Sequence, residues 1–250
     1  MNASISEIGT LINRSLTVVL AFPAMIAHTD KEFDQELRTL GDRLVKMAER
    51  ASEQIACAMK ALSDKNDDIA RDVIKADVAI DRDETEIDEL AMQILATRQP
   101  VATDLRFITM ALKFVVDVER IGDLAVGIAK RALELNRLPP LDSRIELTKL
   151  AQLVQKNLHI ALDAFVRRDA EQATEVIRGD VEIDRLNANY FAELIAHVAT
   201  DPATVTRVLP MTSVCRSLER IGDHVKNLAE EVIFMVRATD VRHRPVIPSN

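Results

Sequence analysis

An internal repeat constrains the fold of this chain more than any other feature. The run Glu-Arg-Ile-Gly-Asp occurs at 119–123 and again at 219–223. A second set of matches precedes it at an offset of 103, with Val73, Ile74, Asp77, Ile80 and Asp81 repeated as Val176, Ile177, Asp180, Ile183 and Asp184. Self-similarity at a fixed spacing is typical of a duplicated structural unit. We therefore expect two related units in tandem.

Apolar residues recur at alternating spacings of three and four along both halves, which is the period of an α-helix. This pattern predicts helices over about 33–62, 69–94 and 101–136, and again over about 147–165, 169–200 and 205–235. Ser143 and Glu146 form a capping-box pattern that predicts the start of the fourth helix. Short breaks between long helices favour antiparallel neighbours. The expected class is all-α, with two tandem pseudo-symmetric three-helix bundles made of six long antiparallel helices.

The expected boundaries follow from the breaks in this pattern. The first bundle is assigned to 28–138 and the second to 141–240, with Pro139 and Pro140 between them. Residues 241–250 are expected to be a flexible tail, because chain ends without packing partners are poorly ordered.

Residues 1–27 are expected to be an extension outside the fold, disordered or reflecting a translation start at Met25. The apolar run at 16–27 also leaves a secretory signal peptide open, although Glu7 and Pro23 argue against it. The run is too short to span a membrane.

Charge and cysteine content narrow the classes of partner. The chain has 32 basic and 40 acidic residues, a net charge of -8, which argues against a nucleic-acid partner and favours cations. Cys57 and Cys215 are the only cysteines and lie far apart, so neither a disulfide framework nor a cysteine zinc site is indicated. A reducing cytosol fits this content.

Acidic residues four apart form the candidate site, because this spacing places both carboxylates on one face of a helix. The pairs are Asp77 with Asp81, Glu119 with Asp123, Asp180 with Asp184, and Glu219 with Asp223. Counting from the turns near Gln99 and Asp201 at about 1.5 Å per residue puts the pairs of each half at one level. Oxygen ligands of this kind suit Mg²⁺, Mn²⁺ or Ca²⁺, and iron where carboxylates bridge several ions. We expect divalent or trivalent metal ions, with iron, manganese, magnesium and zinc as candidates.

Four further residues are candidate supports of this site. Gly122 and Gly222 each cost about 1 kcal/mol inside a helix, which predicts close approach by a neighbouring helix or a ligand. Arg120 and Arg220 either support the site or only neutralise the adjacent acids. The acids themselves have a second interpretation, as a solvated polar face crossed by salt bridges.

His224 is the one histidine that adjoins an acidic pair, so it is both a candidate ligand and a candidate structural residue.

The motifs of the sequence resemble those of the PhoU family of bacterial phosphate-uptake regulators over about 28–242. The resemblance rests on Phe33-Asp34 with Glu36-Leu37, Val73-Ile74 with Asp77, Arg98-Gln99-Pro100 with Asp104-Leu105-Arg106, and both Glu-Arg-Ile-Gly-Asp runs. It implies paired three-helix bundles that carry E/D-x-x-x-D metal clusters, and the motif falls on the four acidic pairs above.

The resemblance also implies a role in phosphate homeostasis. Proteins of this family negatively regulate the phosphate regulon and link the ATPase component of the phosphate ABC transporter to a membrane-bound sensor histidine kinase. On this basis we expect a cytoplasmic homodimer that is not an enzyme, acts as a metal-binding adaptor, binds no nucleic acid and reaches the membrane only through its partners.

Two enzyme classes remain as alternatives. A metal-dependent phosphohydrolase would use the same carboxylates to position a water, but the sequence offers no obvious general base or Gly-rich phosphate loop. A ferritin-like di-iron oxidase would need Glu-x-x-His motifs on facing helices, and the sequence has none.

Overall fold

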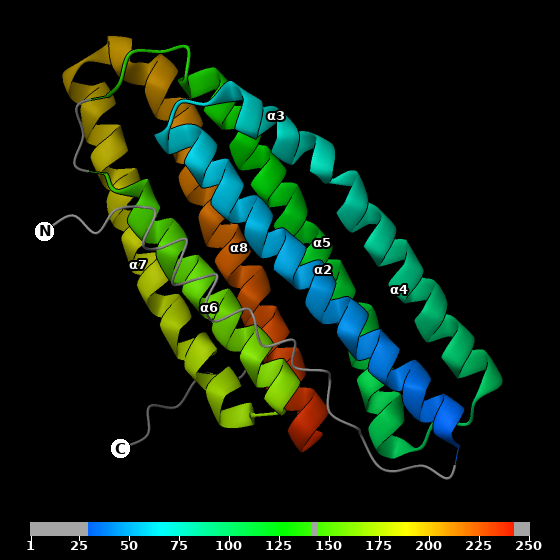
Figure 1. Cartoon of the computed structure of the whole chain (residues 1–250). Coiled ribbons are helices and arrows are strands. Elements are labelled where there is room, and N and C mark those ends of the chain that lie inside the picture. Colours follow the sequence, from blue (N-terminus) through cyan, green and yellow to red (C-terminus); the bar gives the residue numbers. More distant parts are fainter. Residues whose placement is uncertain (1–29, 142–144, 243–250) are drawn as a thin grey trace, which may run out of the picture.

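The computed structural model describes residues 30–141 and 145–242. The extension predicted at 1–27 and most of the tail predicted at 241–250 lie outside these ranges. Within them every regular element is a helix, and the helices run side by side as two bundles (Figure 1). This arrangement confirms the all-α class and the tandem bundles. None of the described helices is both long and apolar enough to cross a membrane.

The first bundle consists of α2 (Lys31–Ser63), α3 (Asp67–Ala76), α4 (Val78–Thr97) and α5 (Ala102–Leu135). Asp30 starts α2, because its carboxylate accepts hydrogen bonds from the N–H groups of Glu32 at 3.0 Å and Phe33 at 3.3 Å. Arg98, just after α4, forms ion pairs with Asp30 at 3.0 Å and with Glu36 at 2.9 Å. The end of α4 is thereby tied to the start of α2.

The predicted helix over 69–94 is interrupted at Asp77, which separates α3 from α4. The backbone of Asp77 stays in the right-handed helical region, with φ -57° and ψ -38°. Its carbonyl accepts hydrogen bonds from the N–H of Ile80 at 2.8 Å and of Asp81 at 3.2 Å, so the chain tightens locally to an i→i+3 turn. The corresponding helix of the second bundle continues through Asp180 without a break.

The second bundle consists of α6 (Leu147–Arg167), α7 (Ala170–Thr200), the 3₁₀ turn η1 (Pro202–Thr204) and α8 (Val205–Arg237). Ser143 lies outside the described residues, and the N-cap of α6 is Glu146, which makes no side-chain capping bond. The capping-box prediction is therefore wrong, and the helix starts later than it implied. Tyr190 of α7 donates a hydrogen bond to the Glu146 carbonyl at 3.1 Å and fixes this start against the bundle.

Arg168 forms the tight reversal between α6 and α7 in the left-handed conformation, with φ 55°. Burial lowers the pKa of its guanidinium, and the charge of buried Asp104 at the start of α5 opposes that shift. This reversal is followed by Asp169, which caps α7 by accepting from the N–H of Glu171 at 2.9 Å.

A single hydrophobic core runs through both bundles. The helices α5 and α8 pack along each other at the centre, and α2 contacts α6 (Figure 1). Phe107 and Phe114 of α5 lie 6.4 Å and 5.0 Å from Phe165 of α6, measured between ring centroids. The two repeats therefore form one packed unit in which each bundle keeps its own hairpin of acidic helices.

Candidate functional site

The acids of the first half meet across the hairpin of α3, α4 and α5. We call Asp77, Asp81, Glu119 and Asp123 the first cluster. Partial burial raises the pKa of Asp77, and the charges of Asp81 on α4 and Asp123 on α5 raise it further. Burial and then the charge of Asp123 raise the pKa of Glu119. These couplings place the four predicted acids close enough to repel one another.

Two more acids, which the sequence reasoning missed, extend the first cluster along α4. The pKa of Glu84 is raised first by burial and then by the charges of Asp88 and Asp81. The pKa of Asp88 is itself raised by burial. The positions 77, 81, 84 and 88 follow one face of a helix, so the spacing of three and four was the signal that identifies them.

The acids of the second half meet in the same way across α7 and α8. We call Asp180, Asp184, Glu219 and Asp223 the second cluster. Burial raises the pKa of Asp184, and the charges of Asp180 and Asp223 add to it. Burial, followed by the charges of Asp223 and Asp184, raises the pKa of Glu219.

Lys226 of α8 contacts the second cluster and was not among the predicted site residues. Its Nζ lies 3.0 Å from Oδ2 of Asp180, whose side chain is almost fully buried. Burial lowers the pKa of Lys226, but the hydrogen bond to Asp180 and the charges of the neighbouring acids together outweigh it, so the net shift is upward. Lys226 therefore supplies a fixed positive charge to the second cluster.

Arg120 forms ion pairs with its neighbouring acids, whereas Arg220, among the described residues, contributes only its charge. Arg120 lies 3.4 Å from Glu119 and 3.2 Å from Asp123. Burial and then Asp180 raise the pKa of Asp223, and the charge of Arg220 is among those that lower it. Salt bridges thus accompany the clusters, as the polar-face interpretation predicted.

His224 is bound away from the acids of its own repeat. Its Nδ1 lies 2.7 Å from Oδ1 of Asp117 on α5. This contact favours a structural role for the histidine over a role as a metal ligand.

Both helix glycines lie where a neighbouring helix comes close. A Cβ on Gly122 would lie 2.9 Å from Cδ1 of Ile80 and 3.3 Å from Oε1 of Gln54. A Cβ on Gly222 would lie 3.2 Å from Cγ2 of Ile183 and 3.4 Å from Oδ1 of Asp180. The expected close approach by a neighbouring helix is confirmed, and it brings the paired acids of each half together.

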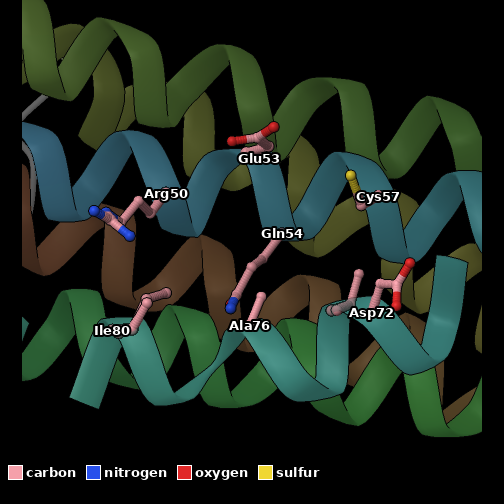
Figure 2. Close-up of a pocket in the computed structure, with 9 residues that line it drawn as sticks. Arg50, Glu53, Gln54, Cys57, Asp72, Ala76 and Ile80 are labelled. Atoms are coloured by element: carbon pink, nitrogen blue, oxygen red, sulfur yellow. The ribbon is translucent and has the colours of Figure 1, made fainter. Parts of the chain in front are cut away.

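Gln54 of α2 contacts the first cluster from the buried side of the bundle. Its side chain is 6% exposed and hydrogen-bonds Asp77, which counteracts the rise in pKa that burial causes there. Figure 2 shows Gln54 pointing from α2 towards Ala76 and Ile80, with which it lines a pocket of about 290 Å³. Its Oε1 has no hydrogen-bond partner in the part of the chain that the structure describes.

The repeat gives the second half a buried amide at the matching position. At an offset of 103 this residue is Asn157 of α6, which lies against Gly179, next to Asp180.

The donor set of both clusters consists of carboxylate oxygens, which suits hard cations. Among residues 30–141 and 145–242, no three His, Cys, Asp or Glu side chains are already grouped as ligands of one ion. The acids of each cluster therefore interact through their charges without forming a ready-made coordination shell. Asp81, Asp123, Asp184 and Asp223 are exposed, and Asp123 is paired with Arg120.

Comparison with known proteins gives consistent matches over both repeats. The model of the PhoU domain family matches residues 44–132 and 147–232. A Pseudomonas aeruginosa protein named as a homologue of the phosphate-specific transport system accessory protein PhoU is 41% identical over 217 residues, which cover 86% of this chain and 90% of that protein.

Two solved structures share the fold. The crystal structure of PhoU from Pseudomonas aeruginosa matches with a TM-score of 0.80 and 40% identity, covering 83% of this chain and 100% of that one. The PhoU phosphate transport regulatory protein from Streptococcus pneumoniae matches with a TM-score of 0.78 and 26% identity, covering 84% and 99%.

Proposed function

We propose, because the chain belongs to the PhoU domain family, that it is a cytoplasmic negative regulator of phosphate uptake and phosphate homeostasis. The coarser part of this role, an accessory function in phosphate transport, rests on relatives that carry that name and match nearly their whole length. The finer part is an adaptor role. The chain would link the ATPase component of the phosphate ABC transporter to the sensor histidine kinase, as a homodimer.

Exposed apolar side chains support the adaptor role. Val78 and Val181 are exposed at matching positions of the two repeats, and Phe191 and Ile195 form an exposed pair on α7. Contiguous exposed apolar patches commonly mark surfaces that dock to partners, and Phe191 and Ile195 lie one turn apart on the same face of α7.

The site proposal rests on acids that lie on two facing helices in each half and whose charges interact. Their mutual repulsion and partial burial hold several pKa values above the ordinary range. We propose that Asp77, Asp81, Glu119 and Asp123, and likewise Asp180, Asp184, Glu219 and Asp223, hold divalent or trivalent metal ions. A bound ion would offset the repulsion and offer open positions to a phosphate or to an oxygen of a partner.

The test combines metal analysis with partner capture. In the variant Glu119→Ala with Asp123→Ala, we expect loss of bound metal and weaker capture of the transporter ATPase component. Glu171→Ala with Glu175→Ala is the matched control, because these exposed acids have the same spacing on α7 but lie outside both clusters. Unchanged metal content in the first variant would contradict the metal assignment, and unchanged capture would contradict its coupling to partners.

We also propose that the chain is not an enzyme. The relatives are named as accessory proteins of transport rather than by a reaction. Incubation of the metal-loaded protein with a generic phosphate monoester is expected to release no phosphate above the buffer rate. Turnover that disappears in the Glu119→Ala, Asp123→Ala variant would instead favour the phosphohydrolase alternative.

A further inference from the structure

The two clusters differ in charge although they descend from one repeated pattern. In the first half, Glu84 and Asp88 continue the acidic face of α4. At the offset of 103 their counterparts on α7 are Asn187 and Phe191, which carry no charge. The first cluster is therefore more negative along its length than the second.

Positive charges differ in the opposite sense. Lys226, which binds Asp180 at 3.0 Å, corresponds at an offset of 100 to Val126, a buried residue of α5. Arg216 corresponds to Val116. Burial and neighbouring acids raise the pKa of Glu219, and the charge of Arg216 opposes that rise. At these two positions the second cluster has cations where the first has valines. At a third position the difference is reversed, because Lys130, whose charge acts on Asp77, corresponds to Glu230.

Buried oxygens without a hydrogen-bond partner among the described residues give independent evidence for a ligand at each cluster, with Oδ1 of Asp180 as the example in the second. Gln54 is 6% exposed, and its Oε1 is without a hydrogen-bond partner in the described part of the chain. This oxygen lies beside Gly122, which is located in the sequence between the two acids Glu119 and Asp123. The same side chain also hydrogen-bonds Asp77. A buried acceptor without a donor is costly, so it favours a donor such as a water molecule held by a cation.

We infer that the duplicated clusters are not equivalent. The first cluster is the principal cation site, and Lys226 occupies Asp180 in the second cluster as an internal counter-ion. A divalent cation binds the second cluster only by displacing Lys226, and it binds there at least about tenfold more weakly. This inference rests on the proposed metal binding and assigns it to one half of the molecule.

The test is a titration of the protein with Mn²⁺, in which the concentration of free ion is measured by its electron paramagnetic resonance signal. Two variants remove matched exposed acids, Asp81→Asn with Asp123→Asn in the first cluster and Asp184→Asn with Asp223→Asn in the second. We expect the first variant to lose the tight class of sites and the second to keep it. Lys226→Met is expected to add a second class whose affinity is at least about tenfold higher than that of the second cluster in the unaltered protein.

The possible outcomes distinguish the inequality of the clusters from the proposed metal binding on which it rests. Equal loss of tight binding in the two double variants would overturn the inequality of the clusters while metal binding stands. Absence of tight Mn²⁺ binding in the unaltered protein would overturn the metal assignment itself, and the inference with it. The double variants decide between these outcomes even where Lys226→Met does not fold.

Discussion

Nδ1 of His224 lies 2.7 Å from Oδ1 of Asp117, and this contact joins α8 to α5 across the boundary between the two bundles. Asn227 donates to the same oxygen at 3.0 Å. At the offset of 100 the counterparts of Asp117 and His224 are Ser217 and Leu124, which cannot reproduce the pair. The polar contact between the repeats is therefore asymmetric. Asp117 of the first repeat binds His224 of the second, and the equivalent positions 217 and 124 form no such pair.

Asp117→Ala is expected to lower the free energy of unfolding by about 1–3 kcal/mol, because it leaves the half-buried His224 and the exposed Asn227 without their acceptor. Urea denaturation at neutral pH measures the change. Asn227→Ala is the control and is expected to cost about 0.5–1.5 kcal/mol, since it removes one bond only. A loss no larger for Asp117→Ala than for Asn227→Ala would show that His224 contributes nothing to the joint.

The two glycines of α5 are expected to respond oppositely to alanine. A Cβ at Gly127 would have only Oγ of Ser217 nearby, at 3.9 Å, so Gly127→Ala is expected to stabilise by about 0.5–1 kcal/mol through helix propensity. A Cβ at Gly122 would lie 2.9 Å from Ile80, which is buried in the core. Gly122→Ala is therefore expected to destabilise by about 1 kcal/mol despite the same propensity gain. Thermal unfolding of both variants checks the difference, and equal stabilisation would contradict the close approach.

Much of the architecture could be predicted because it depends on local spacing. The alternation of apolar residues by three and four predicts the helices. Counting from the turn near Gln99 predicts that Asp77 and Asp123 lie at a similar level, and their charges do interact. The break at Asp77 escaped prediction, because its residues remain helical in pattern and in backbone angles.

Contacts between distant residues escaped prediction for a different reason. Lys226 and Asp180 lie 46 positions apart on separate helices, and their meeting depends on the rotation of α8 about its axis. The buried position of Gln54 depends likewise on how α2 packs against α4 and α5.

Asp81→Asn is expected to change how stability depends on pH. Burial and the charges of Asp81 and Asp123 raise the pKa of Asp77 above its ordinary value of 3.8, and burial, Asp88 and Asp81 raise that of Glu84 above 4.5. Acids with a raised pKa bind protons more tightly in the folded state, so their favourable contribution is full below the ordinary values and is lost as pH rises through the raised ones.

In a chelating buffer at pH 7, we therefore expect Asp81→Asn to be about 0.2–0.5 kcal/mol more stable than the unaltered protein. The difference should vanish below about pH 4, where these carboxyl groups are protonated. Glu175→Gln is the control, because this exposed acid lies outside both clusters. Urea denaturation across this pH range measures the effect, and a gain that persists in acid would rule out charge repulsion as its cause.

Lys226→Met tests the ion pair that distinguishes the second cluster. Asp180 is 3% exposed, so removal of Lys226 leaves a buried carboxylate without its counter-charge. In chelating buffer at pH 7, we expect a loss of about 1–3 kcal/mol in the free energy of unfolding. Lys226→Arg keeps the charge and is expected to lose less.

The double variant Asp180→Asn with Lys226→Met separates the pair from the packing of the lysine stem. Removing both charges should recover most of the loss, because a neutral amide is cheaper to bury than an unpaired carboxylate. A double variant as unstable as Lys226→Met alone would mean that the stem, rather than the charge, stabilises this site. Recovery in the double variant would instead establish Lys226 as the internal counter-ion of Asp180.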